Sequence, residues 1–250
     1  MPANLKPVPD RLIVLTFDDG CKSDVRNVAP MLKEYGFGAT FFVNDQSWKT
    51  DHYMTWDDVH RVHEMGFEIG NHTAHHPSVV DLRRREFLAE LEAVERHCEA
   101  FGIPQPTSFC YPEFQFSPAA VEVLAEKGYA FARRGPFPEC ECESEGMRGP
   151  VYNPAENHPL LVPTTGFSGP HWGLDNLKWA VEKAADGKIA VLCFHGVPDL
   201  DHPSVHTDLE NFRTYMSFLR DSGCTVIAMH DMADYVDIFT AQPADRLLGS

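Results

Sequence analysis

The sequence lacks any long apolar run. No stretch approaches the roughly 20 consecutive apolar residues that a membrane-spanning helix needs. The first ten residues, MPANLKPVPD, contain no apolar segment of the kind found in secretory signals, and the strand-like segment RLIVLTF follows at once. These absences predict a protein without a membrane span and, for the chain as written, a cytoplasmic location.

Positive charge is also scarce. The chain has 21 Lys and Arg against 37 Asp and Glu, which gives a formal net charge of −16. Such a charge opposes binding to phosphate backbones, so nucleic acid is not an expected partner. Cysteines number seven, an odd count, and Cys98, Cys110 and Cys193 lie in helical or strand patterns, which favours buried thiols over a disulfide framework.

Short β-branched-rich segments alternate with amphipathic stretches along the whole chain of 250 residues, a pattern typical of βα units. It predicts a single α/β domain over residues 1–250, a distorted (β/α) barrel with seven or eight mainly parallel strands, and a loop or insertion near 136–157. Glycines 36, 66, 102, 128, 187 and 223 follow the helical stretches as C-caps do. The expected strands cover 12–17, 39–43, 67–70, 107–111, 129–133, 160–163, 189–194 and 225–229.

Two carboxylates close the first expected strand. Asp18 and Asp19 stand in the segment TFDDG at 16–20, at the strand's carboxyl end, where barrel enzymes assemble their active sites. A strand that ends in an Asp-Gly turn is also common without catalysis. The Asp pair by itself therefore leaves both interpretations open.

Histidines follow two other expected strands. The third runs into His72, Thr73, His75 and His76, and two histidines four residues apart can face one metal ion if the turn between them is helical. The seventh strand is followed directly by His195. Because the carboxyl ends of parallel strands lie on one rim, these groups are expected to converge.

One Asp and two His form a three-ligand site that leaves a position open for water, which suits Zn²⁺ or a similar divalent ion acting as a Lewis acid. A second carboxylate beside the liganding one can then accept the proton of the water. The expected cofactor is one divalent ion, with Zn²⁺ as the first choice.

These motifs resemble the polysaccharide deacetylase family, also called the NodB-homology group or carbohydrate esterase family 4. TFDDG at 16–20 and H-T-x-x-H at 72–76 resemble its first two motifs, and ATFFV at 39–43 its second strand. The resemblance implies Asp18 as general base, Asp19, His72 and His76 as metal ligands, Thr73 as a brace of the metal loop, and His195 as general acid. Spacing and the following proline favour His76 over His75, with His75 remaining as an alternative.

The later motifs depart from the family pattern. Cys110, in the segment FCYPE at 109–113, stands where the family has an Arg that orients the base, and Glu113 stands where Tyr supplies a backbone N–H to the oxyanion. Tyr111 and Glu113 are the expected substrate or oxyanion contacts. Trp172, in the segment GPHWGLD at 169–175, is expected either to stack on a sugar or to pack in the core.

The expected activity is hydrolysis of acetyl groups from N-acetylated amino sugars or their oligomers or polymers, with a water activated at the metal as nucleophile. One alternative is a related carbon–nitrogen hydrolase that acts on a small amide, imide or ureide. A second is a barrel that binds carbohydrate without hydrolysing it. A last alternative is a second metal or redox site formed by Cys140 and Cys142 with Cys21, but C-x-C is a poor zinc spacing and a flexible acidic loop is favoured there.

Overall fold

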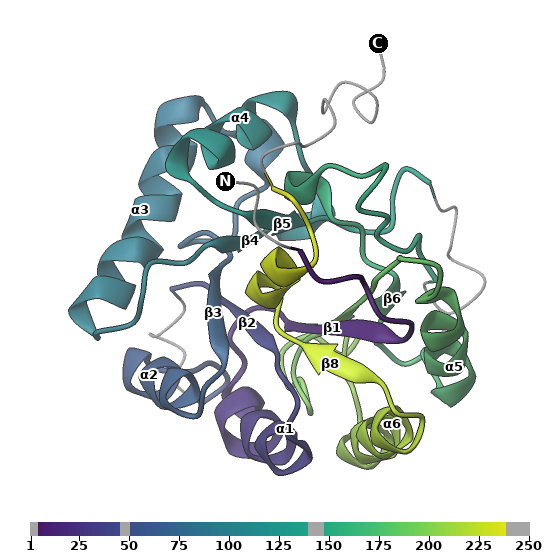
Figure 1. Ribbon diagram of the computed structural model, residues 1–250. Coiled ribbons are helices and arrows are strands. Elements are labelled where there is room, and N and C mark those ends of the chain that lie inside the picture. The colour runs from purple at the N-terminus through teal and green to yellow at the C-terminus, as the bar shows by residue number, and fades with distance from the viewer. Residues whose placement is uncertain (1–4, 46–50, 140–147, 239–250) are drawn as a thin grey trace.

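The computed structural model describes residues 5–45, 51–139 and 148–238. The described residues form one curled sheet of parallel strands with helices around its outside (Figure 1). The strands are β1 (Leu12–Phe17), β2 (Thr40–Val43), β3 (Glu68–Asn71), β4 (Ser108–Cys110), β5 (Phe131–Arg133), β6 (Gly166–Phe167), β7 (Ala190–Phe194) and β8 (Thr225–Ile227). The predicted distorted (β/α) barrel with seven or eight mainly parallel strands is therefore confirmed.

The strand order along the sheet is β5-β4-β3-β2-β1-β7-β6, and β8 pairs with the first half of β1. No ladder joins β5 to β6 among the described residues, and an isolated bridge between Arg133 and Val162 lies on that side instead. The barrel is thus distorted between β5 and β6, the two strands at the ends of this order. Since all the ladders are parallel, the carboxyl ends of the strands share one rim.

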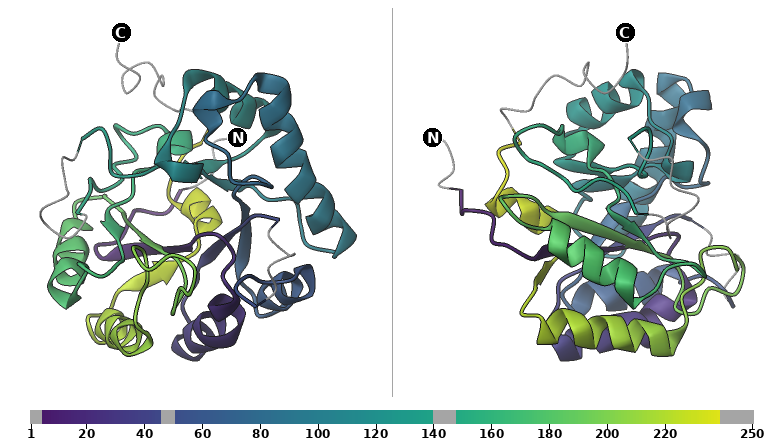
Figure 2. Two further views of the ribbon diagram at one scale, coloured as in Figure 1. Left: turned by 180° about the vertical axis from the view of Figure 1, so that it is seen from behind. Right: turned by 90° about the vertical axis from the view of Figure 1, so that its right-hand side faces the viewer.

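In the described parts of the chain, six α-helices cover the outside of the sheet. They are α1 (Ala29–Tyr35), α2 (Trp56–Glu64), α3 (Arg84–Ala100), α4 (Pro118–Lys127), α5 (Leu174–Lys183) and α6 (Leu209–Asp221). Shorter helical turns are η1 (Asp24–Val28), η2 (Val79–Asp81), η3 (Pro112–Phe114), η4 (Pro159–Leu161) and η5 (His230–Asp234). Figure 2 shows α5 and α6 lying side by side on the outer layer. No helix in the described ranges combines the length and the apolar character needed to cross a bilayer.

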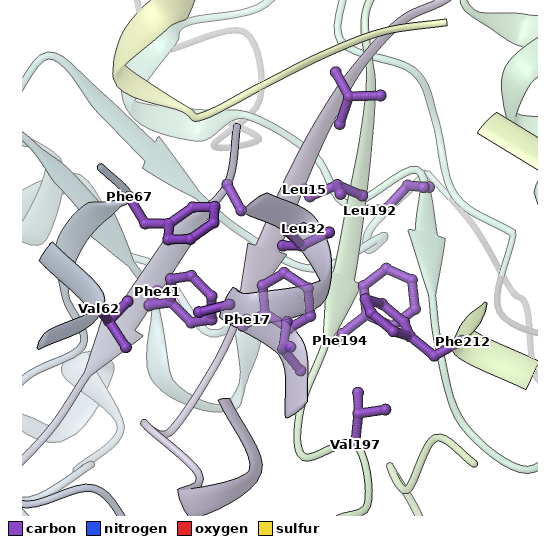
Figure 3. Packing of buried hydrophobic residues seen from close by; sticks show 14 of the residues in the cluster. Leu15, Phe17, Leu32, Phe41, Val62, Phe67, Leu192, Phe194, Val197 and Phe212 are labelled. Carbon is purple, nitrogen blue, oxygen red and sulfur yellow. The ribbon is translucent and has the colours of Figure 1, made fainter. Parts of the chain in front are cut away.

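The main core lies between the first strands and the outer helices (Figure 3). The fully buried ring of Phe17 stacks on Phe41 with 5.0 Å between centroids and on Phe194 with 5.4 Å, and it meets the Phe212 ring edge-on. Because successive strand residues point to opposite faces, Phe17 faces this outer core while Thr16 and Asp18 face the barrel interior. The aromatic core therefore fixes the direction in which Asp18 points.

Turn chemistry agrees with the sequence. The six glycines expected to cap helices all have positive φ, between 66° and 98°.

The strand expected over 160–163 is wrong, however. Pro159 begins the short helix η4 there, and Nδ1 of His158 accepts the N–H of Leu160, so this segment turns before β6 begins at Gly166. In the described parts of the expected 136–157 loop, 136–139 and 148–157, no helix or regular strand forms.

Candidate active site

Asp19, His72 and His76 form a cluster at the carboxyl ends of β1 and β3. Oδ1 of Asp19 lies 3.5 Å from Nε2 of His72 and 3.6 Å from Nε2 of His76. Ligand atoms about 2.0–2.2 Å from a tetrahedral metal ion are roughly 3.3–3.6 Å apart. The three side chains therefore have donor types that suit a divalent ion, and Asp19 has suitable separations from both imidazoles.

The backbone around this cluster is held by specific bonds. Nδ1 of His72 lies 2.8 Å from the carbonyl oxygen of Cys110, which directs Nε2 toward Asp19. Thr73 receives a hydrogen bond on its Oγ1 from the N–H of His76 and donates its own N–H to Oδ1 of Asn71. Asp19, Thr73 and His76 all have positive φ, a conformation that non-glycine residues adopt at a cost and that concentrates at functional sites.

The two alternative histidines differ in placement. His75 is exposed and directs its ring to Glu90, with Nδ1 2.9 Å from Oε1. His76 is the one beside Asp19. Burial and then the charge of His72 lower the pKa of His76 to about 4, so at neutral pH its ring is unprotonated and can bind a metal ion.

Asp18 lies next to this cluster and is 98% buried. Its Oδ2 accepts a hydrogen bond from Nη2 of Arg133 and is contacted by two thiols, Sγ of Cys110 at 3.6 Å and Sγ of Cys193 at 3.4 Å. Its Oδ1 has no hydrogen-bond partner among the described residues. Burial, the largest influence, disfavours ionisation of Asp18, but the Arg133 guanidinium, His72 and His195 together outweigh it and hold the pKa of Asp18 below its ordinary value.

Arg133 is a residue of this site that the sequence interpretation missed. It is fully buried, donates through Nη1 to Oγ1 of Thr164, and is the cross-strand register partner of Cys110 on β4. A guanidinium thus reaches Asp18 from the strand adjacent to the one that carries Cys110. An arginine closing the apolar segment YAFAR at the rim of an expected barrel was the available signal.

His195 follows β7 and faces both aspartates. Its Nε2 lies 4.0 Å from Oδ2 of Asp18 and 3.8 Å from Oδ2 of Asp19. The ring of Phe167 meets it edge-on at 5.6 Å, and Nδ1 has no hydrogen-bond partner among the described residues. All three polar clusters that the sequence placed on one rim are therefore brought together.

A cavity of about 310 Å³ opens above these groups. Its walls include Tyr111 and Glu113, both expected there. Glu113 has a positive φ, while Tyr111 has its donors committed, N–H to the carbonyl of Arg133 and Oη–H to that of Leu160. Tyr111 therefore offers the cavity its ring rather than a free donor. The remaining wall residues were not foreseen and are Phe114, Phe167, His202, Ser204 and Val205.

Of the two placements expected for Trp172, the structure shows packing in the core. Its side chain is buried in the main core, where it sits against Gly166, and it is not part of the cavity wall. Asp175 lies on the surface of α5 and pairs with Lys178. The aromatic walls beside His195 come instead from Phe114 and Phe167, whose rings meet edge-on at 5.2 Å. Cys140 and Cys142 lie outside the described residues, and Cys21 is buried with its thiol 3.6 Å from Oδ2 of Asp199.

A parallel barrel that gathers an Asp-His-His cluster, a second buried carboxylate and a histidine around one rim cavity has the arrangement of a barrel hydrolase. A sequence profile described as "Polysaccharide deacetylase" matches residues 5–132, which are 128 of the 250 residues. The chain belongs to the polysaccharide deacetylase family. Arg133 and His195 lie beyond the matched segment.

Two of the individual proteins similar to this chain are named as deacetylases. A chitin deacetylase of Pestalotiopsis sp is 30% identical over 115 residues, which are 46% of this chain and 38% of that protein. A solved peptidoglycan N-acetylglucosamine deacetylase shares 15% identity over 93% of this chain and 92% of its own, with a TM-score of 0.62.

A family 4 carbohydrate esterase pseudoenzyme from Bacillus anthracis shares 16% identity over 92% of this chain and 67% of its own, with a TM-score of 0.60. The match to each curated chitin deacetylase covers less than half of that protein's length. The similarity to the solved structures establishes the fold of this chain.

Proposed function

We propose that this protein is a metal-dependent deacetylase that hydrolyses N-acetyl groups on amino sugars or their oligomers. The fold does not carry this proposal, since a pseudoenzyme has a similar fold. One observation does: Asp18 is ionised, its Oδ1 has no hydrogen-bond partner among the described residues, and it lines the same cavity as Asp19, His72, His76 and His195. Metal ligands, base and acid are the groups that this reaction needs.

Asp19, His72 and His76 would hold the ion. Two imidazoles and one carboxylate favour Zn²⁺ among the common divalent ions. When bound, such an ion supplies Lewis acidity that polarises the acyl oxygen and makes a water molecule more acidic. The contact between His72 and the Cys110 carbonyl supports this assignment, because histidine ligands generally donate their second ring nitrogen to an oxygen.

The remaining steps belong to the side chains of the chain itself. Oδ1 of Asp18 accepts the proton of the attacking water, and Arg133 keeps the carboxylate ionised and oriented by holding Oδ2. The backbone N–H of Glu113, which lies at a turn with positive φ, stabilises the negative charge on the acyl oxygen. Nε2 of His195 then donates a proton to the leaving nitrogen as the carbon–nitrogen bond breaks.

The cavity supports a substrate the size of one amino-sugar unit at the reacting position. Its volume of about 310 Å³ lies at the small end of ligand pockets, which typically occupy about 300–1,000 Å³. Phe114 and Phe167 supply apolar faces against which a sugar ring or an acyl methyl group packs. The names of the related chitin and peptidoglycan deacetylases support the same substrate class.

The same apolar walls favour one second candidate, a carbon–nitrogen hydrolase that acts on a small amide, imide or ureide. Phe167, Phe114 and Val205 line the cavity near His195, whereas Trp172 lies in the core. A small apolar acyl amide would fill such a cavity without needing polar contacts to sugar hydroxyls.

We also propose that residues 1–250 form a single domain, because β1 near one end of the described chain pairs with β8 near the other.

Hydrolysis rates separate these candidates, measured as acetate release from the sugars and as chromatographic product formation from the small amides and imides. The zinc-loaded protein is assayed on N-acetylglucosamine oligomers of one to six units and on a matched set of small acylamides and cyclic imides, with Asp18→Asn as the blank. Release from the oligomers at a kcat/KM at least tenfold above the small amides supports the sugar deacetylase. The opposite ranking supports the small-amide hydrolase, and no Asp18-dependent turnover on either set refutes both.

A further inference from the structure

The cavity has one wall to which the steps of hydrolysis assign no role. The loop between β7 and α6 contributes His202, Ser204 and Val205 to this wall. Two of these three side chains are polar and can form a hydrogen bond with a hydroxyl group. The cavity therefore has polar as well as apolar lining outside the groups assigned to the reaction.

His202 is the polar residue of this wall that is held in place. Its backbone N–H donates to Oδ1 of Asp199 at 2.7 Å, and the same oxygen accepts the N–H of Asp201 at 2.9 Å. Oδ2 of Asp199 accepts the N–H of Gly196, the residue after His195, at 3.4 Å. Asp199 is buried, so these bonds tie the turn that carries His202 to the strand end that carries His195.

Asp199 also orients the ring of His202. Nδ1 of His202 is buried and lies 3.6 Å from Oδ2 of Asp199, although the side chain as a whole is 44% exposed. The separation is too long for a hydrogen bond, but the negative charge of the carboxylate favours a proton on this nitrogen. In the neutral ring Nε2 is then the hydrogen-bond acceptor, and it lies on the exposed edge. Nε2 has no hydrogen-bond partner in the part of the chain that the structure describes.

We propose that His202 is a specificity-determining residue, whose Nε2 accepts a hydrogen bond from a hydroxyl group of the sugar in the cavity. This inference rests on the proposed function, since an amino sugar must occupy the cavity. It deepens that function because the contact separates sugars from small apolar amides. An apolar amide has no hydroxyl group to offer, so it would cover Nε2 without replacing the hydrogen bond that Nε2 makes to water.

The other polar side chains of the lining are less suited to this role. Ser204 and Glu113 are exposed, and no hydrogen bond to either side chain is found among the described residues. The hydroxyl of Tyr111 donates to the carbonyl oxygen of Leu160. A side chain that is already held loses less freedom when a ligand binds, so the fixed imidazole is the better hydrogen-bonding partner for a substrate.

The test measures binding to the zinc-loaded Asp18→Asn protein, in which hydrolysis should be blocked. The probes are the methyl β-glycoside of N-acetylglucosamine and its monodeoxy analogues, each of which lacks one free hydroxyl group. NMR titration gives their dissociation constants. One analogue should bind about three- to tenfold more weakly than the parent sugar, the range expected for the loss of one neutral hydrogen bond. Adding His202→Leu should weaken the parent sugar to the level of that analogue, so that the ratio of the two constants falls to about one.

Two further substitutions separate a contact from a structural role. His202→Gln keeps a hydrogen-bonding group near the position of Nε2, and its ratio should stay above that of His202→Leu. His206→Ala removes another histidine of the same loop, which does not line the cavity, and should leave the ratio unchanged. The bond to Oδ1 of Asp199 comes from the backbone of residue 202, so the variants should fold. His202→Ala replaces His202→Leu if circular dichroism shows that the leucine variant does not.

Three outcomes would overturn the proposal: a ratio that persists for every analogue in folded His202→Leu, equal binding of the parent sugar and all analogues while His202 is present, or no binding of the parent sugar. The proposed hydrolysis is judged separately, by Asp18-dependent acetate release with His202 intact. Release without a ratio above one would leave the deacetylase standing and refute the role of His202. Selective binding without release would do the reverse.

Discussion

Replacing Arg133 by methionine should make the activity depend on pH in a new way. Arg133 and Asp18 form a fully buried ion pair, and methionine keeps much of the side-chain volume without the charge. Removing one partner of such a pair costs about 3–5 kcal/mol. If this cost falls on the ionised form of Asp18, it raises the pKa of that carboxyl by about 2–4 units, since one unit corresponds to about 1.4 kcal/mol.

The direction of each effect follows from the sign of the shift. In the wild type the pKa of Asp18 lies below its ordinary value, so Asp18 is ionised wherever the enzyme is active. In Arg133→Met the pKa of Asp18 lies above its ordinary value. At each pH below this raised pKa, kcat/KM should fall about tenfold per pH unit. The wild-type pair stabilises the fold above the unfolded-state pKa of about 3.9, and this contribution is lost as pH falls through the lower folded pKa. In the variant the raised folded-state pKa of Asp18 adds a destabilisation, which is full above that pKa and is relieved as pH falls from it to about 3.9. The variant's stability deficit should therefore be largest at neutral pH, shrink between the raised pKa and about pH 4, and shrink further below about pH 4 as the wild type loses its own contribution.

The assays are kcat/KM from pH 5 to 9 and urea unfolding at several pH values. Arg220→Met is the control, because Arg220 pairs with Asp221 on the surface of α6 and should change neither curve. Adding Cys110→Arg to Arg133→Met should move the acid limb back, since the two positions are register partners. An acid limb that stays in place in a folded Arg133→Met protein would refute the role given to Arg133.

Three further substitutions test other parts of the account. Asp18→Asn should lower kcat by about 10²–10⁴-fold, the usual contribution of a general base, while the protein retains its metal by elemental analysis. His195→Ala should slow the hydrolysis of an acetamide far more than that of an acetyl ester with an acidic leaving group, because only the amine must be protonated as it leaves; equal losses on both substrates would argue against an acid role. Phe17→Ala should cost about 3–5 kcal/mol of unfolding free energy in urea denaturation, because it removes a fully buried ring that contacts three others.

Local sequence signals predicted much of the fold. The first strand was expected over 12–17 and is observed over Leu12–Phe17, because its apolar residues are bounded by an Asp-Gly turn. The segment 160–163 has a strand-like composition but follows a proline and a capping histidine, and these local bonds outweigh composition. The helix-capping glycines were identifiable because only a left-handed residue ends such a turn readily.

The site was predictable where one motif supplied several residues and hidden where strand register decided. Asp19, His72 and His76 could be placed together because the carboxyl ends of parallel strands meet. Arg133 could not be assigned to Asp18, since its contact depends on the pairing of β4 with β5. Trp172 could not be separated from a sugar-stacking residue by sequence, because an indole serves packing and binding equally well.

The central claim is that Asp19, His72 and His76 bind an ion on which hydrolysis depends. Metal content by elemental analysis, paired with acetate release from N-acetylglucosamine oligomers before and after chelation, tests it in the wild type, His72→Ala and His75→Ala. We expect about one ion and chelator-sensitive release in the wild type and in His75→Ala, whose ring faces Glu90, and the loss of both in His72→Ala. Release that survives chelation, or full metal content in His72→Ala, would contradict the account.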